Sequence, residues 1–86
     1  MSPGVRSVEE IRAWLLDKLR RELHADGPLD GSCPLADYGL ESRSAIGVTA
    51  DLEDWLGVEL DPTMFFDYPT IDELARFLKD ELDDRT

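Results

Sequence analysis

Apolar residues recur every three or four positions in three stretches of the chain, which is the period of an amphipathic helix. The first stretch begins at Ser7, which has with Glu10 the spacing of a capping box. Its apolar positions are Val8, Ile11, Leu15, Leu19 and Leu23. We therefore expect a first helix that starts at Ser7, buries one face and has His24 in its last turn.

The helical period returns between Ser42 and Leu56, and Gly57 then supplies a stop signal. The apolar surface of this second helix is expected from Ala45, Ile46, Val48, Leu52, Trp55 and Leu56. Gly47 lies in its middle, where glycine costs roughly 1 kcal/mol against alanine. This glycine is consistent with close helix packing or with a closely approaching partner, and the sequence leaves both open.

Two start signals predict the remaining helices. Asp61 followed by Pro62 is a cap with a proline at the first helical position, so we expect a short third helix at 63–66. Thr70 and Glu73 again have capping-box spacing. They open a last helix with a buried stripe of Ile71, Leu74, Phe77, Leu78 and Leu82.

Residues 25–40 lose the helical period and contain several turn residues. A loop of this length in a small domain is often packed by its own side chains. The candidate anchors are Leu29, Leu35, Tyr38 and Leu40. No stretch alternates as a β-strand does. The sequence thus predicts an all-α fold, a small four-helix bundle of three main helices and a short third, with a long loop between helices one and two.

Length and charge narrow the class of protein. The 86 residues make one domain, placed at 7–82 between tails at 1–6 and 83–86. Twenty acidic residues against nine basic ones give a net charge of −11, which repels nucleic acid and anionic membranes. The charge alone is explained either by solubility or by attraction of proteins with basic patches. No apolar run fits a membrane span or a secretory signal. We therefore expect a cytoplasmic protein, and a monomer by default, since the sequence gives no clear sign of self-association. Because the chain begins with Met and ends soon after its last helical pattern, we expect it to be freestanding.

No catalytic or metal-binding constellation is present. Cys33 and His24 are each the only residue of their type, which excludes an internal disulfide and argues against a structural zinc site. A nucleophilic serine needs a base, and His24 lies eighteen residues before Ser42 at the end of another helix. We therefore expect a protein that is not an enzyme and in which Cys33 has no catalytic role.

Ser42 stands where the loop becomes the second helix. Serine is a preferred N-cap, so one interpretation is a cap alone; the other is an anchor for a covalent arm. The segment from Asp37 to Ser42, DYGLES, resembles the D-x-G-x-D-S segment of acyl carrier proteins. The helix end at 51–57 and the FDYPT stretch within 60–75 are similar to polyketide-type carriers, and the resemblance covers 35–78.

This resemblance implies a cofactor and a function. It implies that a phosphopantetheinyl transferase moves 4′-phosphopantetheine from coenzyme A onto Ser42. The arm would then hold acyl or polyketide intermediates as thioesters for ketosynthase, acyltransferase, adenylating or thioesterase enzymes of secondary metabolism. The residues expected to meet these partners are Glu41, Arg43, Asp51, Glu53 and Asp54. The alternatives are a peptidyl carrier with aminoacyl cargo and a helical interaction module that is never modified.

Three residues around Ser42 depart from the family pattern. Glu41 replaces the usual aspartate, which keeps the carboxylate, so we expect modification to survive. Arg43 stands where leucine or isoleucine usually follows the serine, and Ser44 stands where methionine is common. We expect Arg43 to discriminate among partners because its charge lies close to the arm.

Overall fold

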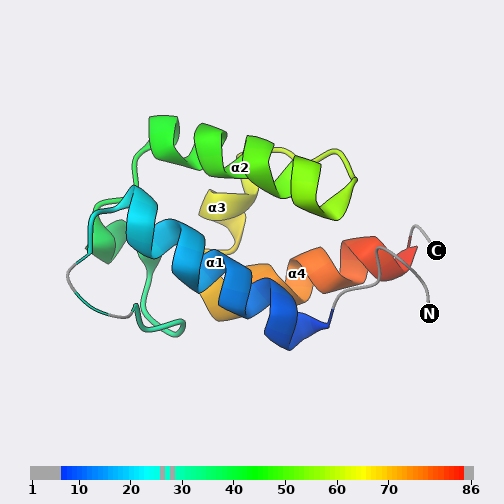
Figure 1. The fold of residues 1–86 in the computed structure, drawn as a ribbon, viewed down its shortest axis with the longest axis horizontal. Helices are drawn as coiled ribbons and strands as arrows, with labels where there is room; N and C mark the ends of the chain where they lie inside the picture. The colour runs from blue at the N-terminus through cyan, green and yellow to red at the C-terminus, as the bar shows by residue number, and fades with distance from the viewer. Residues whose placement is uncertain (1–6, 26, 28, 85–86) are drawn as a thin grey trace.

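The computed structural model describes residues 7–25, 27 and 29–84 (Figure 1). In chain order the elements are α1 (Val8–Glu22), the 3-10 helix η1 (Leu35–Tyr38), α2 (Ser42–Leu56), α3 (Met64–Asp67) and α4 (Ile71–Asp84). Within these described ranges there is no strand, only an isolated bridge between Pro34 and Thr70. The predicted all-α bundle with a short third helix is confirmed. The predicted tail at 1–6 lies outside the described residues, and α4 continues two residues past the expected end at 82.

The start of α1 is fixed by the predicted capping box. The Ser7 hydroxyl accepts a hydrogen bond from the Glu10 N–H at 3.1 Å, and the Glu10 carboxylate accepts one from the Ser7 N–H at 3.3 Å. These two bonds satisfy backbone donors that an uncapped helix leaves open. The boundary predicted from the sequence is therefore confirmed.

The end of α1 differs from the prediction. The helix stops at Glu22, and His24 lies beyond it with a φ of 54°, so its placement in the last helical turn is wrong. The His24 N–H donates to the Arg21 carbonyl at 3.3 Å and the Ala25 N–H donates to the Arg20 carbonyl at 3.0 Å. This bond pair closes a helix through a left-handed residue, a conformation that histidine tolerates better than most residues.

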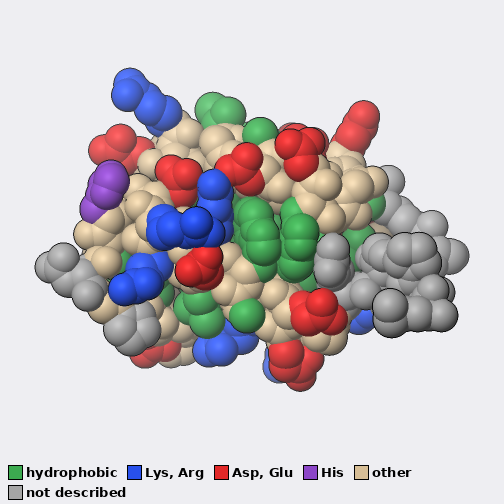
Figure 2. Space-filling model, in the orientation of Figure 1, with side chains coloured by type: hydrophobic (Ala, Val, Ile, Leu, Met, Phe, Trp, Pro, Cys, Tyr) green, Lys and Arg blue, Asp and Glu red, His purple; other side chains and the backbone are tan. Residues whose placement is uncertain are grey.

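The core lies between α1, α2 and α4 (Figure 1). Its completely buried members come from all three helices and include Ile11, Leu15, Leu19, Val48, Leu52, Ile71, Leu74 and Leu78. Two aromatic pairs lie at its edge. Trp14 of α1 stacks on Trp55 of α2 with ring centroids 5.1 Å apart, and Tyr68 stacks on Phe77 at 4.5 Å. Hydrophobic side chains reach the surface between α1 and α2 (Figure 2).

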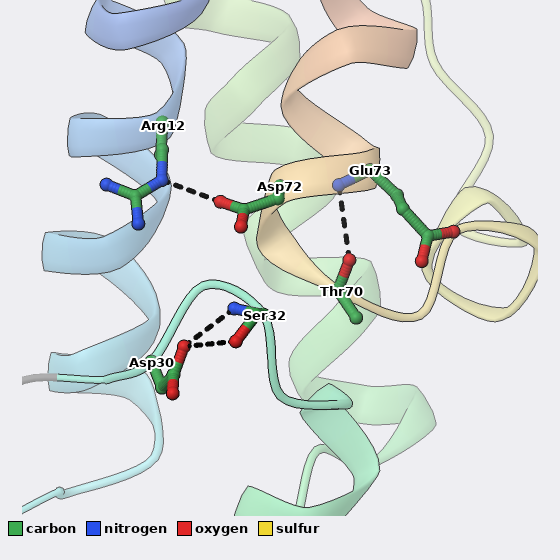
Figure 3. A network of polar contacts seen from close by, with 6 residues as sticks. All are labelled: Arg12, Asp30, Ser32, Thr70, Asp72 and Glu73. Carbon is green, nitrogen blue, oxygen red and sulfur yellow. Dashed lines mark hydrogen bonds and ion pairs between the residues drawn. The ribbon is translucent and has the colours of Figure 1, made fainter.

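The long loop is packed by its own side chains, as predicted. Leu29 and Leu35 are buried, and Tyr38 and Leu40 pack against the core. The Tyr38 hydroxyl accepts a hydrogen bond from the Asp30 N–H at 2.9 Å. The Asp30 carboxylate in turn accepts bonds from the hydroxyl and the N–H of Ser32, which lower its pKa (Figure 3). The sequence did not predict η1, which lies inside this loop.

Backbone hydrogen bonds fasten the loop to the start of α4. The Leu35 N–H donates to the Pro69 carbonyl at 2.8 Å, and the Asp72 N–H donates to the Gly31 carbonyl at 3.0 Å. Arg12 of α1 closes the same corner by a 2.6 Å contact with the Asp72 carboxylate (Figure 3). A Cβ on Gly31 would lie 2.6 Å from that carboxylate, so a larger residue there would displace the Asp72 side chain from its place beside Arg12.

The two start signals in the second half of the chain are only partly realised. The Asp61 carboxylate accepts a hydrogen bond from the Thr63 N–H at 2.9 Å, which lowers the pKa of Asp61, but α3 itself begins at Met64. The Thr70 hydroxyl accepts from the Glu73 N–H at 3.2 Å. The Glu73 side chain points away from Thr70 (Figure 3), so the reciprocal half of the predicted capping box is missing among the described contacts.

The two glycines of the α2 segment have different structural roles. Gly57 ends the helix with a φ of 73° and donates its N–H to the Glu53 carbonyl at 2.8 Å. Gly47 is exposed in the middle of the helix, and a Cβ built on it meets nothing within 4 Å in the described part of the chain. Close packing of another helix within the molecule therefore does not explain Gly47.

Alanine at these two glycines is expected to change stability in opposite directions. Gly47→Ala should raise the free energy of unfolding by about 1 kcal/mol, because it removes the helix penalty of glycine without a steric clash. Gly57→Ala should lower it by about 1–2 kcal/mol, because alanine is strained at positive φ. Urea unfolding of both variants measures the two changes. Equal signs would contradict the assignment of Gly57 as the left-handed cap.

Candidate functional site

Ser42 is the first residue of α2 and is exposed to solvent. The chain leaves η1, turns at Gly39 with a φ of 84° and runs extended through Glu41, with a φ of −110° and a ψ of 163°. The Glu41 carbonyl accepts the first helical hydrogen bond, from the Ala45 N–H at 2.9 Å. The left-handed glycine thus reverses the chain so that Ser42 emerges at the rim of the bundle.

Ser42 does not cap the helix. The N-cap is Glu41, and its side chain makes no capping hydrogen bond. Among the residues described, no hydrogen bond involves the Ser42 hydroxyl either. The interpretation of Ser42 as a cap alone is therefore wrong, and its hydroxyl is available for chemistry.

The start of α2 suits a negatively charged group on Ser42. The first turn of α1 contains Glu9 and Glu10 and that of α4 contains Asp72 and Glu73, whereas the first turn of α2 contains no acidic residue. The first N–H groups of a helix have no partner within it, and the helix dipole places partial positive charge there. A phosphodiester on Ser42 would lie at this end of α2, so the site fits covalent phosphopantetheine.

Two of the five expected recognition residues are engaged inside the molecule. Asp51 pairs with Lys18 of α1, and this hydrogen bond is the main cause of the raised pKa of Lys18. The half-buried Glu53 accepts the backbone N–H of Leu60 at 2.9 Å, which fastens the segment after α2. These two carboxylates therefore stabilise the fold, whatever they do in recognition.

The other three are exposed and lie at the two ends of α2. Glu41 and Arg43 flank Ser42, and Asp54 lies about 18 Å further along the helix axis. In the described part of the chain none of the three forms an ion pair. The structure thus brings one free carboxylate and one free guanidinium directly to the serine.

The sequence did not predict the apolar surface near Ser42. Ile46, one of the apolar positions expected in the second helix, lies four residues after the serine and is 58% exposed, and Phe66 of α3 is 64% exposed. A pocket of about 120 Å³ lies between η1 and α3, lined by Leu35, Ala36, Leu40, Phe65, Phe66 and Pro69. Since Leu40 precedes Ser42 by two residues, this apolar pocket lies close to the serine. Of the paired phenylalanines at 65–66, Phe65 is buried and Phe66 is exposed, which no local sequence pattern indicated.

Other site types find no support in the described residues. No group of three or more His, Cys, Asp or Glu side chains there could hold a metal ion, and Cys33 is a half-buried free thiol. None of the helices described is long and apolar enough to cross a membrane. Among the described residues, the exposed Ser42 hydroxyl is therefore the main candidate for chemistry.

A family model described as "Phosphopantetheine attachment site" matches residues 13–78. The chain belongs to this phosphopantetheine-attachment family. The match begins inside α1, ends inside α4 and contains Ser42. Covalent 4′-phosphopantetheine is the cofactor of the family, which agrees with the geometry at the start of α2.

Known members of this family include modules of much longer enzymes and small carriers. The chain is 35% identical over 72 residues to polyketide synthase PksR of Bacillus subtilis, covering 83% of this chain but only 3% of that protein. It is 36% identical, with a TM-score of 0.83, to a free-standing peptidyl carrier protein of Acinetobacter baumannii, covering 88% of this chain and 96% of that one.

An acyl carrier protein from Anabaena sp. PCC 7120 with a variant phosphopantetheinylation-site sequence is similar over nearly the whole length. It is 37% identical with a TM-score of 0.80, and the alignment covers 95% of this chain and 92% of that one. The two solved structures show that this chain has the fold of carrier proteins.

Proposed function

We propose that this chain is an acyl carrier protein that holds acyl or polyketide intermediates as thioesters on a 4′-phosphopantetheine arm attached to Ser42. The observation that carries the proposal is the exposed Ser42 hydroxyl, without a hydrogen bond among the described residues, at the start of α2. Its place inside the region matched by the phosphopantetheine-attachment family supports the same residue.

The protein's part in this function is presentation. When bound, the arm supplies a terminal thiol that carries the cargo. Gly39 turns the chain so that Ser42 lies at the surface, and the first N–H groups of α2 face the negative charge attached there. No catalytic base approaches Ser42 in the described structure, so partner enzymes would perform all the bond chemistry.

Polyketide-type acyl cargo is the primary assignment. The similarity to polyketide synthases, at 35% identity, and the FDYPT stretch support it. Aminoacyl cargo is the second candidate, because a peptidyl carrier protein of 36% identity has the same fold. The proposed partners are a phosphopantetheinyl transferase and acyl-loading or acyl-processing enzymes of the cytoplasm, which meet the carrier as a monomer.

These partners would dock on the exposed end of α2 around Ser42. Glu41 offers a carboxylate to basic residues, Arg43 offers a positive charge, and Ile46 offers apolar area. Contacts between exposed charges mainly set the encounter rate and the register of two proteins, and they weaken with salt. Weak contacts suit a carrier that visits several enzymes in turn.

Intact mass measurement tests the carrier assignment. The protein is incubated with coenzyme A and a broad-specificity phosphopantetheinyl transferase, and we expect a mass gain of one phosphopantetheine arm. If several transferases give no gain although each modifies a known carrier in parallel, the alternative of an unmodified interaction module replaces the proposal.

A further inference from the structure

Arg43 has a positive charge that the fold does not use. Side chains three or four positions apart are neighbours on a helix, and the residues of α2 that follow Arg43 at this spacing are Ile46 and Gly47, neither of them charged. Other basic residues have a carboxylate at this spacing: Arg21 pairs with Asp17, Lys18 with Glu22 and Lys79 with Asp83. In a chain with a net charge of −11, Arg43 therefore differs from these residues in having no carboxylate at helical spacing.

The position of Arg43 is also unfavourable for the helix. It is the second residue of α2, where the helix dipole already places partial positive charge. A cation there destabilises the helix, and no contact within the described residues offsets this. Side chains on a helix lean toward its N-terminus, so the stem of Arg43 leads toward the end where Ser42 and the free N–H groups lie.

We propose that the Arg43 guanidinium binds the phosphodiester that joins the arm to Ser42. This inference rests on the proposed function, because it requires a phosphorylated serine. A phosphodiester carries one negative charge, and the planar guanidinium is suited to binding phosphate oxygens through two N–H groups. Arg43 and the first N–H groups of α2 then hold the same anion, and the arm leaves the protein in a restricted direction.

Arg43 is thereby a positioning residue. It acts on the first atoms of the arm and leaves the thioester chemistry to the partners. The apolar residue that usually follows the serine in this family has no charge that could bind the phosphodiester. The proposed contact is therefore particular to chains with arginine at this position. The charge of Arg43 is neutralised in the loaded protein and is free in the unloaded one.

The test compares the parent with Arg43→Gln, Arg43→Lys and Arg20→Gln, each unloaded and loaded, with loading verified by intact mass. Arg20 is a matched control, since it is an exposed arginine for which the described residues provide no ion pair. We expect loading to raise the Tm of the parent more than that of Arg43→Gln, by on the order of 3 °C. Arg43→Lys should retain part of the parent's additional Tm rise on loading, and Arg20→Gln should show the same Tm rise as the parent.

Magnetic resonance provides a readout that a general change in stability does not move. On loading, the side-chain Nε–H resonance of Arg43 should shift and that of Arg20 should not. The phosphorus resonance of loaded Arg43→Gln should differ from that of the parent, and the difference should shrink in high salt. If Arg43→Gln cannot be loaded, the Nε–H resonance in the parent decides alone.

The possible failures are distinguishable. A parent protein that gains no arm overturns both the carrier function and the role of Arg43. A parent that is loaded normally, but whose Arg43 Nε–H resonance is unchanged, overturns the role of Arg43 and leaves the carrier function intact. Equal Tm shifts in the parent and in Arg43→Gln lead to the same conclusion.

Discussion

Replacing Ser42 by alanine is expected to abolish attachment of the phosphopantetheine arm completely. The transferred group forms its bond to the serine oxygen, and alanine has no atom that can take its place. Intact mass after incubation with coenzyme A and a transferase measures the loss. The Ser42 hydroxyl makes no hydrogen bond among the described residues. The free energy of unfolding of the variant should therefore be within about 0.5 kcal/mol of that of the parent.

Ser44→Ala is the matched control for this experiment. Ser44 lies two residues further along α2 and is half-buried, whereas Ser42 is exposed. Successive helical residues are rotated by about 100°, so Ser44 points about 200° away from Ser42 around the helix axis. Ser44→Ala should gain the arm as the parent does. A Ser42→Ala protein that still gains the arm would mean that another residue is the attachment point.

Leu15→Ala is expected to have the largest effect on stability. Leu15 has no exposed surface and lies in the core shared by α1, α2 and α4. Truncating a buried leucine costs about 2–5 kcal/mol, from lost burial and from the cavity left behind. The total stability of a chain of 86 residues is about 4–13 kcal/mol. The variant should therefore lose a large share of its free energy of unfolding.

Leu16→Ala is the control for the same chemical change. Leu16 is the next residue of α1 but is only half-buried, so its truncation should lower the free energy of unfolding by about 1 kcal/mol. Urea unfolding followed by circular dichroism measures both variants, with the midpoint as the readout. Equal losses in the two variants would contradict the position of α1 in the core.

Local signals in the sequence predicted much of the fold. The capping box at Ser7 and the glycine stop at Gly57 fixed one end of each of two helices, because these signals act through hydrogen bonds within a few residues. The end of α1 at His24 was predicted wrongly, since histidine carries no strong preference for ending a helix. The 3-10 helix η1 was not predicted; besides its local bonds, the Leu35 N–H donates to the distant Pro69 carbonyl, a contact that no local pattern indicates.

The features of the candidate site also fall into local ones, which the sequence predicted, and ones that depend on contacts between separate segments, which it did not. The motif that ends at Ser42 was readable in the sequence, because its residue types and spacing are local. The sequence could not tell an arm-bearing serine from a capping one, since this depends on whether the hydroxyl bonds a backbone N–H. Nor could it show that Asp51 and Glu53 are engaged by Lys18 and by the Leu60 N–H, because these contacts join separate segments.

The stacked pair of Trp14 and Trp55 has a practical consequence. The chain has only two tryptophans, and the pair joins α1 to α2 with ring centroids 5.1 Å apart. Their fluorescence is therefore sensitive to a change in the separation of the two helices. An event that moves α2 away from α1 should change the emission, whereas an event confined to the serine end should leave it unchanged. The tryptophan pair is thus an intrinsic fluorescence probe of the contact between α1 and α2, and no added dye is needed.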